Sequence, residues 1–434
     1  MINAIVSKLT RFLPKSGMGR SVIALASSTA AAQAITAIAM PVVTRLYTPA
    51  EIGIISIFIS FFGFWSVMLS LRYESAILIS QTGAESHQVF RVGMICVVSM
   101  SALSAPILGI LVRSGTLGFG LMPLWSVLAT APIMFGYGLF MMYRSWGLRS
   151  GLVRDISRAT VMRALSNGLA RIVLGIGGVG VPGLFVAELA GAWSATGALF
   201  RSVRERHAAS RPAFSWSDLA RVAKKYSKFA VYETPSVAID QLALTIPVPM
   251  IGALYGAQAA GWFGLARILV AIPNAQIGRA IADVFQMELA SKVRKGTRAE
   301  AHQLFYTLVR KLALFGLLPL AVMMVVAPLV VPWIFGRLWA PMGTMTAIIA
   351  PWLYAALIVT TLSRLLSVLE RQEYKLIYDV TALLLIGAVY AIARYHALGL
   401  MESIMLLSGA NIIGYVVYFV VIVHIVEKDL KEDA

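Results

Sequence analysis

The chain has 434 residues, of which 59% are hydrophobic and only 13% charged, with a formal net charge of +17. A globular domain typically carries about 25% charged residues, so this composition excludes an ordinary soluble protein. The basic residues lie between long apolar runs, which is typical of the positive-inside pattern of membrane proteins and argues against nucleic acid as a partner. With one cysteine, Cys96, five scattered histidines and no glycine-rich phosphate loop, the sequence predicts neither a metal nor a cofactor.

In chain order, residues 1–20 come first and are amphipathic, which predicts a helix lying on the cytoplasmic leaflet. Twelve apolar segments then follow, each about as long as the ~20 residues that a membrane span requires. They cover approximately residues 21–46, 52–73, 91–112, 120–142, 155–176, 181–200, 229–255, 260–284, 305–333, 340–366, 376–395 and 402–426. The sequence therefore predicts an all-α integral membrane protein with twelve transmembrane helices.

The distribution of basic residues predicts the sidedness of these helices. Most of the 37 Lys and Arg residues fall on the side that holds both termini and a basic central loop at residues 201–228. By the positive-inside rule this side is cytoplasmic. The loops on the other side are short, which leaves little room for a catalytic site outside the bilayer.

A weak internal repeat relates the two halves of the chain. Four pairs share one offset of 208 positions: Pro41 with Pro249, Leu46 with Leu254, Tyr47 with Tyr255, and Gly53 with Gly261. Such a repeat predicts two six-helix lobes, residues 1–205 and 206–434, related by a pseudo-two-fold axis.

Residues of this repeat also carry a family resemblance. Residues 41–53, the run LRYESAI at 71–77, and residues 261–285 with Arg267 and Pro273 resemble the polysaccharide flippases of the multidrug/oligosaccharidyl-lipid/polysaccharide (MOP) superfamily. The resemblance implies a fold like that of the multidrug (MATE) exporters and a transporter rather than an enzyme. It also implies a bacterial inner membrane location and an O-antigen, capsule or exopolysaccharide repeat unit on undecaprenyl pyrophosphate as substrate.

Charged residues within the predicted spans are the candidate functional groups, because each is costly at mid-bilayer unless it is paired or hydrated. In segment 155–176, Arg163, Asn167 and Arg171 form one polar stripe. The stripe fits either a cationic wall for an anionic substrate or a set of bonds between helices. Glu188, in the next segment, lies at nearly the depth of Arg171, so these two form a predicted structural pair. Arg163 is then the better substrate candidate.

Segment 229–255 carries Glu233 and Asp240 on one face, with Pro235 predicting a bend between them. These carboxylates fit two roles: binding a proton or sodium ion for coupling, or neutralisation by Arg279 of the next segment. We favour neutralisation for Glu233 and leave both roles open for Asp240.

Arg267 is the principal substrate candidate, because no carboxylate of its own hairpin lies at its depth and because it matches the family pattern. Arg163, Arg72, Asn167 and Arg279 complete the predicted cationic site. Arg72 alternatively extends to lipid head groups. Its spacing of two from Glu74 places the two side chains on different faces of a continuous helix.

The function predicted from these features is the flipping of undecaprenyl-pyrophosphate-linked oligosaccharide by alternating access, with membrane lipids around the chain. The planar fork of arginine suits the pyrophosphate because it binds two oxygens at once. Three alternatives are a drug or cation exporter of the same superfamily, a flippase for the lipid-linked peptidoglycan precursor, and a membrane-bound polymerase or glycosyltransferase. Whether polysaccharide polymerase or other assembly proteins dock on the central loop stays open.

Overall fold

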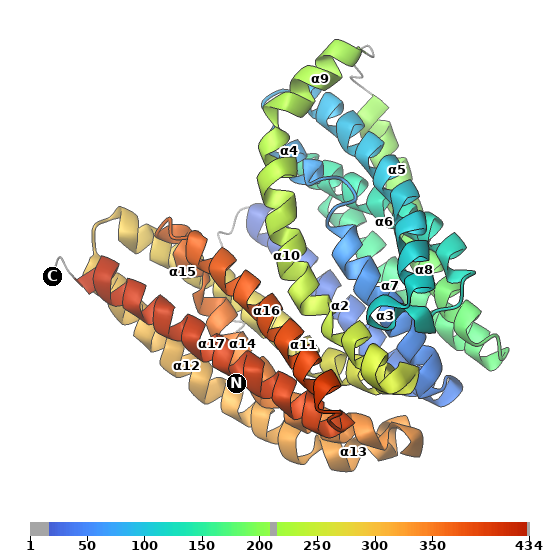
Figure 1. The fold of residues 1–434 in the computed structure, drawn as a ribbon. Coiled ribbons are helices and arrows are strands. Elements are labelled where there is room, and N and C mark those ends of the chain that lie inside the picture. Colours follow the sequence, from blue (N-terminus) through green and yellow to red (C-terminus); the bar gives the residue numbers. More distant parts are fainter. Residues whose placement is uncertain (1–16, 209–214, 432–434) are drawn as a thin grey trace. The chain divides into compact units, whose positions relative to one another are not determined.

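The computed structural model describes residues 17–208 and 215–431, and every regular element within them is helical (Figure 1). The predicted interfacial helix falls largely on residues 1–16, which lie outside the described residues. The N-terminal helices are α2 (Gly17–Leu46), α3 (Pro49–Ser66), α4 (Tyr73–Ile79), α5 (Gly83–Ser114), η1 (Thr116–Leu121), α6 (Ser126–Arg149), α7 (Val153–Ile176), α8 (Val181–Ala208) and α9 (Trp216–Lys225).

The helices that follow are η2 (Phe229–Glu233), α10 (Thr234–Thr245), α11 (Pro247–Arg294), α12 (Arg298–Val325), α13 (Ala327–Phe335), η3 (Arg337–Trp339), α14 (Ala340–Leu362), α15 (Arg364–Val368), α16 (Glu373–Tyr395) and α17 (Leu400–Lys431). Each predicted span overlaps at least one of these helices. The predicted all-α architecture is therefore present throughout the described residues.

Ten helical segments of the described residues are long and apolar enough to cross a membrane. One of them, residues 229–271, is a 43-residue run that Gly256 interrupts with a φ of 84°. α7 is not among the ten, because charged residues such as Arg163 and Arg171 lower its hydropathy.

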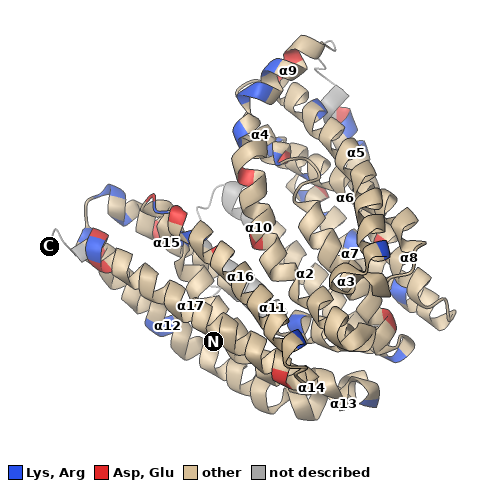
Figure 2. Ribbon diagram, viewed as in Figure 1, with Lys and Arg blue, Asp and Glu red and all other residues tan. Residues whose placement is uncertain are grey.

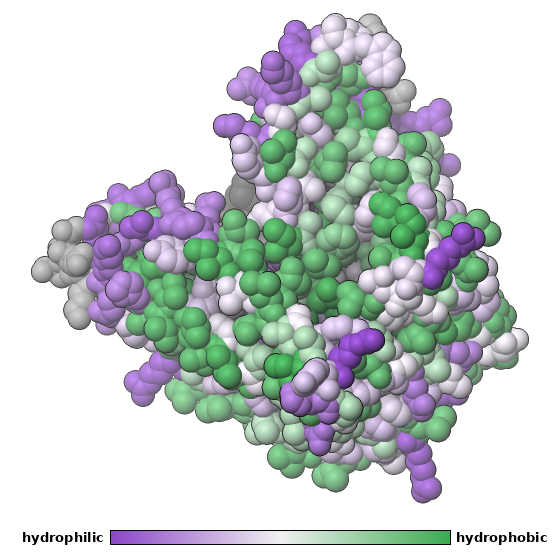
Figure 3. All heavy atoms as spheres, in the orientation of Figure 1, coloured by the Kyte–Doolittle hydropathy of each residue, from purple (hydrophilic) through white to green (hydrophobic). Residues whose placement is uncertain are grey.

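The surface of the helices matches a lipid environment (Figure 3). Large apolar side chains are widely exposed, among them Leu318, Leu329 and Trp333. Charged residues lie mainly toward the ends of α16 and α17, whose middle stretches are uncharged (Figure 2). Long helices with so many exposed apolar side chains are stable in a lipid bilayer and would be unfavourable in water.

Two segments differ from their predictions. The helix predicted at 52–73 ends as α3 at Ser66, and the chain then turns through Leu71 and Arg72, whose φ angles are 47° and 64°. The predicted loop 201–228 is partly helical, since α8 continues to Ala208 and α9 follows. Leu219 and Val222 of α9 pack into the core of the N-terminal helices. The prediction of a loop relied on the many basic residues of this segment and overlooked these two apolar side chains.

The chain forms two compact units. The first comprises residues 1–46, 65–110 and 124–235, and the second comprises residues 47–64, 111–123 and 236–434. The core of the first unit is built from fully buried side chains of several helices, including Ile77, Val89, Met142, Ile156 and Leu199. The predicted lobes, residues 1–205 and 206–434, rest on a symmetry between the two halves of the chain. The division into compact units does not test that symmetry, so the lobes stay a prediction.

Two glycines of the sequence repeat meet each other inside the second unit. A Cβ on Gly53 would lie 1.7 Å from the Ala257 carbonyl oxygen, and a Cβ on Gly261 would lie 2.0 Å from the Pro49 carbonyl oxygen. The two contacts are equivalent under the repeat offset of 208, which relates Gly53 to Gly261 and Pro49 to Ala257. The helices α3 and α11 therefore cross with local two-fold symmetry. Backbone approach this close excludes every side chain larger than hydrogen at either position.

We expect Gly53→Ala and Gly261→Ala each to destabilise the protein by about 1–3 kcal/mol, because the new methyl group meets backbone that cannot rotate away. Thermal unfolding of the detergent-solubilised protein measures this change. Gly387→Ala is the matched control, since a Cβ there meets nothing within 4 Å. Equal melting of Gly53→Ala and Gly387→Ala would show that the two helices do not cross this closely.

Candidate functional site

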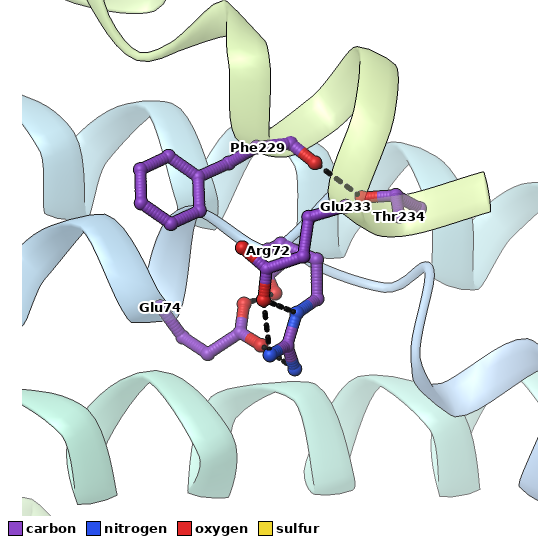
Figure 4. A network of polar contacts seen from close by, with 6 residues as sticks. Arg72, Glu74, Phe229, Glu233 and Thr234 are labelled. Atoms are coloured by element: carbon purple, nitrogen blue, oxygen red, sulfur yellow. Dashed lines mark hydrogen bonds and ion pairs between the residues drawn. The ribbon is translucent and has the colours of Figure 1, made fainter. Parts of the chain in front are cut away.

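Arg72 joins two carboxylates at the break between α3 and α4 (Figure 4). Its Nη1 donates to Glu74 Oε1 at 3.0 Å, while Nε and Nη2 donate to Glu233 Oε1 at 2.9 and 2.5 Å. Ser70 donates a further hydrogen bond to Glu74. The Arg72 side chain is 24% exposed and that of Glu74 only 7%. The cluster therefore holds two carboxylates around one guanidinium.

One expectation about this cluster is wrong. Arg72 and Glu74 do touch despite their spacing, because the positive φ of Arg72 interrupts the helix on which the prediction relied. Glu233 is paired with Arg72, a partner that the sequence reasoning did not name, and its expected pairing with Arg279 stays a prediction. The Arg279 side chain itself lies outside the described residues, so its role stays a prediction.

The position of Glu233 depends on an irregular turn. η2 is a π-helical turn, and directly after it the Thr234 hydroxyl donates to the Phe229 carbonyl at 3.1 Å (Figure 4). Single π-turns of this kind widen a helix and redirect its side chains, often at functional positions. The only sequence signal for such an irregularity was Pro235, which predicted a bend.

A second cluster of the first unit links α7 with α8. Arg171 Nη2 donates to Glu188 Oε1 at 2.6 Å, and Asn167 Nδ2 donates to the same oxygen at 2.9 Å. The side chains of Arg171 and Glu188 are 19% and 13% exposed. The guanidinium of Arg163, one turn before Asn167, lies 4.6 Å from the centre of the Tyr137 ring. The hairpin thus brings together the two residues that the sequence placed at one depth.

Arg267 has a different environment in the second unit. Its Nη2 donates to the Leu244 carbonyl at 2.5 Å, and its guanidinium lies 5.9 Å from the Phe263 ring centre and 5.8 Å from that of Trp352. Leu244 is in the last turn of α10, where carbonyls lack donors of their own helix. Every residue has a backbone carbonyl, so the sequence does not mark this partner. Comparing the depths of charged residues within the hairpin therefore could not reveal it.

Asp240 lies beside a lysine that the sequence reasoning did not single out. Asp240 Oδ1 is 3.6 Å from Lys375 Nζ, and Lys375 donates to Asp379 Oδ2 at 2.5 Å. The Asp379 side chain is 5% exposed. Lys375 precedes the predicted span at 376–395 and was counted with the cytoplasmic charges; its spacing of four from Asp379 was the available signal.

The predicted cationic site therefore falls into separate clusters. Arg72, Arg163 and Asn167 belong to the first unit and Arg267 to the second, so a surface that joins them stays a prediction. Among the described residues, no group of three or more His, Cys, Asp or Glu side chains is placed to hold a metal ion.

Comparison with known proteins identifies relatives of this architecture. The model of the family described as "Polysaccharide biosynthesis protein" matches residues 42–344. No curated protein sequence matches the chain. Among solved structures, an inward-facing multidrug resistance MATE transporter of the MOP superfamily is similar with a TM-score of 0.68 and 15% identity, over 93% of this chain and 96% of that one.

Two further structures share the fold. The lipid II flippase MurJ has a TM-score of 0.69 at 10% identity, with 92% of this chain and 87% of that chain covered. A MOP superfamily transporter from Pyrococcus furiosus, whose binding pocket is described as reversed in polarity, has a TM-score of 0.58 at 14% identity, with 95% and 96% covered. At these identities the likeness shows the fold, which is that of a multi-pass membrane protein.

Removal of one member of the α7–α8 pair is expected to cost about 3 kcal/mol, because it leaves the other member in a largely buried place without its partner of opposite charge. Arg171→Met and Glu188→Gln should each lower the protein's abundance in the membrane and its melting temperature. The double variant should lose less than the sum of the two single losses. Strictly additive losses would show that the two side chains do not stabilise each other.

Proposed function

We propose that this chain, which belongs to the polysaccharide biosynthesis protein family and is a MOP superfamily transporter and not an enzyme, flips a lipid-linked oligosaccharide across the bacterial inner membrane. The family match carries the proposal, because it covers residues 42–344 and so includes Arg72, Arg163 and Arg267. The substrate of this proposal is a polysaccharide repeat unit on undecaprenyl pyrophosphate. Its anionic linkage calls for cationic partners, and its glycan calls for a hydrated path.

The arginines differ in how far their partners neutralise their positive charge, and this difference indicates which of them can best bind a pyrophosphate. Arg171 is offset by Glu188, and Arg72 is more than offset by the two carboxylates Glu74 and Glu233. Arg267 contacts a neutral carbonyl and two rings, which leave its positive charge in place. This difference supports Arg267 as the principal ligand, since a guanidinium with remaining donors can bind two phosphate oxygens. Arg163, against the Tyr137 ring, comes second.

The transport mechanism in this proposal is alternating access by two six-helix lobes, residues 1–205 and 206–434. Twelve spans fit the described helices if α7 is added to the ten apolar segments and the run 229–271 is divided at Gly256. The crossing of Gly53 and Gly261 supports a two-fold relation between the lobes. Both termini are cytoplasmic in this scheme. Membrane lipids surround the helices, and polymerase or other assembly proteins are candidate partners.

Reporter fusions test the topology. A fusion at His302 should report the cytoplasm, while fusions at Thr116 and Leu398 should report the opposite side, because the basic loops mark the cytoplasmic face. Alkaline phosphatase and fluorescent-protein fusions give opposite signals on the two sides, so they serve as mutual controls. A cytoplasmic signal at Thr116 would contradict the twelve-span scheme.

Substitution of Arg267 tests the substrate site. We expect Arg267→Ala to reduce export of surface polysaccharide per protein molecule at least tenfold in a strain that lacks its own flippase, as loss of a desolvated charge contact of about 1.4 kcal/mol or more would produce. Arg267→Lys should recover part of the export, because lysine keeps the charge without the bidentate geometry. Export is normalised to the amount of each variant in the membrane.

A structural role of Arg267 predicts a different pattern in the same experiment. If its bond to the Leu244 carbonyl only holds the end of α10, Arg267→Ala lowers abundance while export per molecule stays normal. Trp352→Leu, which removes a neighbouring ring without removing charge, controls for loss of packing. Normal export at normal abundance would remove Arg267 from the proposed site.

The likeness to the lipid II flippase favours one alternative substrate, the lipid-linked peptidoglycan precursor. That substrate shares the pyrophosphate and the polyprenyl tail, so the same arginines would serve. Growth of a strain depleted of its lipid II flippase distinguishes the two: rescue by this chain would favour the alternative, and rescue of surface polysaccharide alone would favour the proposal.

A further inference from the structure

One cluster of the second unit places a lysine between two carboxylates of different helices. Asp240 comes from α10, whereas Lys375 and Asp379 come from α16. The ammonium is 2.5 Å from Asp379 Oδ2 and 3.6 Å from Asp240 Oδ1. Because the two distances differ, the contact with Asp379 is the tight one and the contact with Asp240 the loose one.

The burial of Asp379 requires a positive charge at this position. Its side chain is 5% exposed, whereas those of Asp240 and Lys375 are 44% and 47% exposed. A carboxylate removed from water is costly unless a cation and hydrogen bonds replace its hydration. Tyr378, which precedes Asp379 in the chain, stacks on Tyr418 with ring centres 4.2 Å apart, and neither ring carries a positive charge. The charge comes from Lys375.

Two carboxylates and one ammonium carry the same formal charge as two carboxylates and one alkali-metal ion. Oxygen ligands from two helices are also the donor set that hard cations prefer. The Lys375 ammonium, however, is attached to the chain one helical turn from Asp379, so its effective concentration beside the two carboxylates is high. A free metal ion would have to outcompete it for the same position.

We propose that the Lys375 ammonium occupies the position that a monovalent metal ion would take between Asp240 and Asp379. The pair therefore needs no bound ion in this protein, and the loss of the lysine creates a sodium site. In the native chain, Lys375 is a built-in counter-ion that links α10 to α16. This inference concerns ion occupancy, and it stands or fails independently of the transported substrate.

The test measures the melting temperature of the purified full-length protein in detergent, with sodium chloride or choline chloride at equal ionic strength. The native protein should melt at the same temperature in both salts. Lys375→Ala should melt at a lower temperature in choline and gain ~2 °C or more in sodium, as a ligand that binds the folded state alone requires. Lys428→Ala, at an exposed position of α17, is the matched control and should behave like the native protein.

Second substitutions assign the gain to the two carboxylates. Adding Asp240→Asn or Asp379→Asn to Lys375→Ala should abolish the difference between sodium and choline. A sodium-specific gain in Lys375→Ala that persists in both double variants would overturn the proposal, because the ion would then bind elsewhere.

The native protein provides a test that does not depend on the folding of Lys375→Ala. Specific stabilisation of the native chain by sodium, lost in Asp240→Asn, would show that an ion binds beside the lysine and would overturn the proposal. Equal melting of Lys375→Ala in both salts would overturn it as well. Because none of these measurements involves export, a failure here leaves the proposed flippase function untouched, and the reverse also holds.

Discussion

A charge inside an apolar helix is costly unless a partner lies beside it, and the polar architecture of this protein follows from that constraint. The four clusters described here satisfy it in four ways. Arg171 uses a carboxylate of the adjoining helix, Arg72 uses two carboxylates at a helix break, Lys375 bridges two carboxylates, and Arg267 uses a carbonyl and two rings. The partners differ in charge, and this difference separates residues that hold helices together from residues with charge to offer a substrate.

The partners that sequence reasoning found are those that local geometry determines. The turn between α7 and α8 is short, so counting residues from it places Arg171 and Glu188 at one depth, and the structure brings them together at 2.6 Å. The same counting works for any hairpin, because each helix rises 1.5 Å per residue. The all-α architecture follows equally directly from twelve long apolar runs.

The partners that sequence reasoning missed depend on irregular backbone or on distant segments. Arg72 and Glu233 are 161 residues apart, and both stand at irregular turns, one with a positive φ and one of π type. Periodicity assumes a regular helix and so fails at these residues. Arg267 bonds to a carbonyl, which every residue possesses, so no pattern of side chains marks it.

The crossing of Gly53 with Gly261 has a consequence for the history of the chain. A Cβ on either glycine would meet the backbone of the other glycine and the carbonyl of the residue four positions before it. Residues beside a two-fold axis make such paired contacts in a homodimer. A half-length ancestor could have closed the same contact with a second copy of itself, so that any substitution there would have acted on both partners simultaneously. Fusion of two such halves would have let most paired positions diverge, which agrees with the few matches between the halves. These two glycines could not diverge, because each backbone occupies the volume that a side chain on the other would fill.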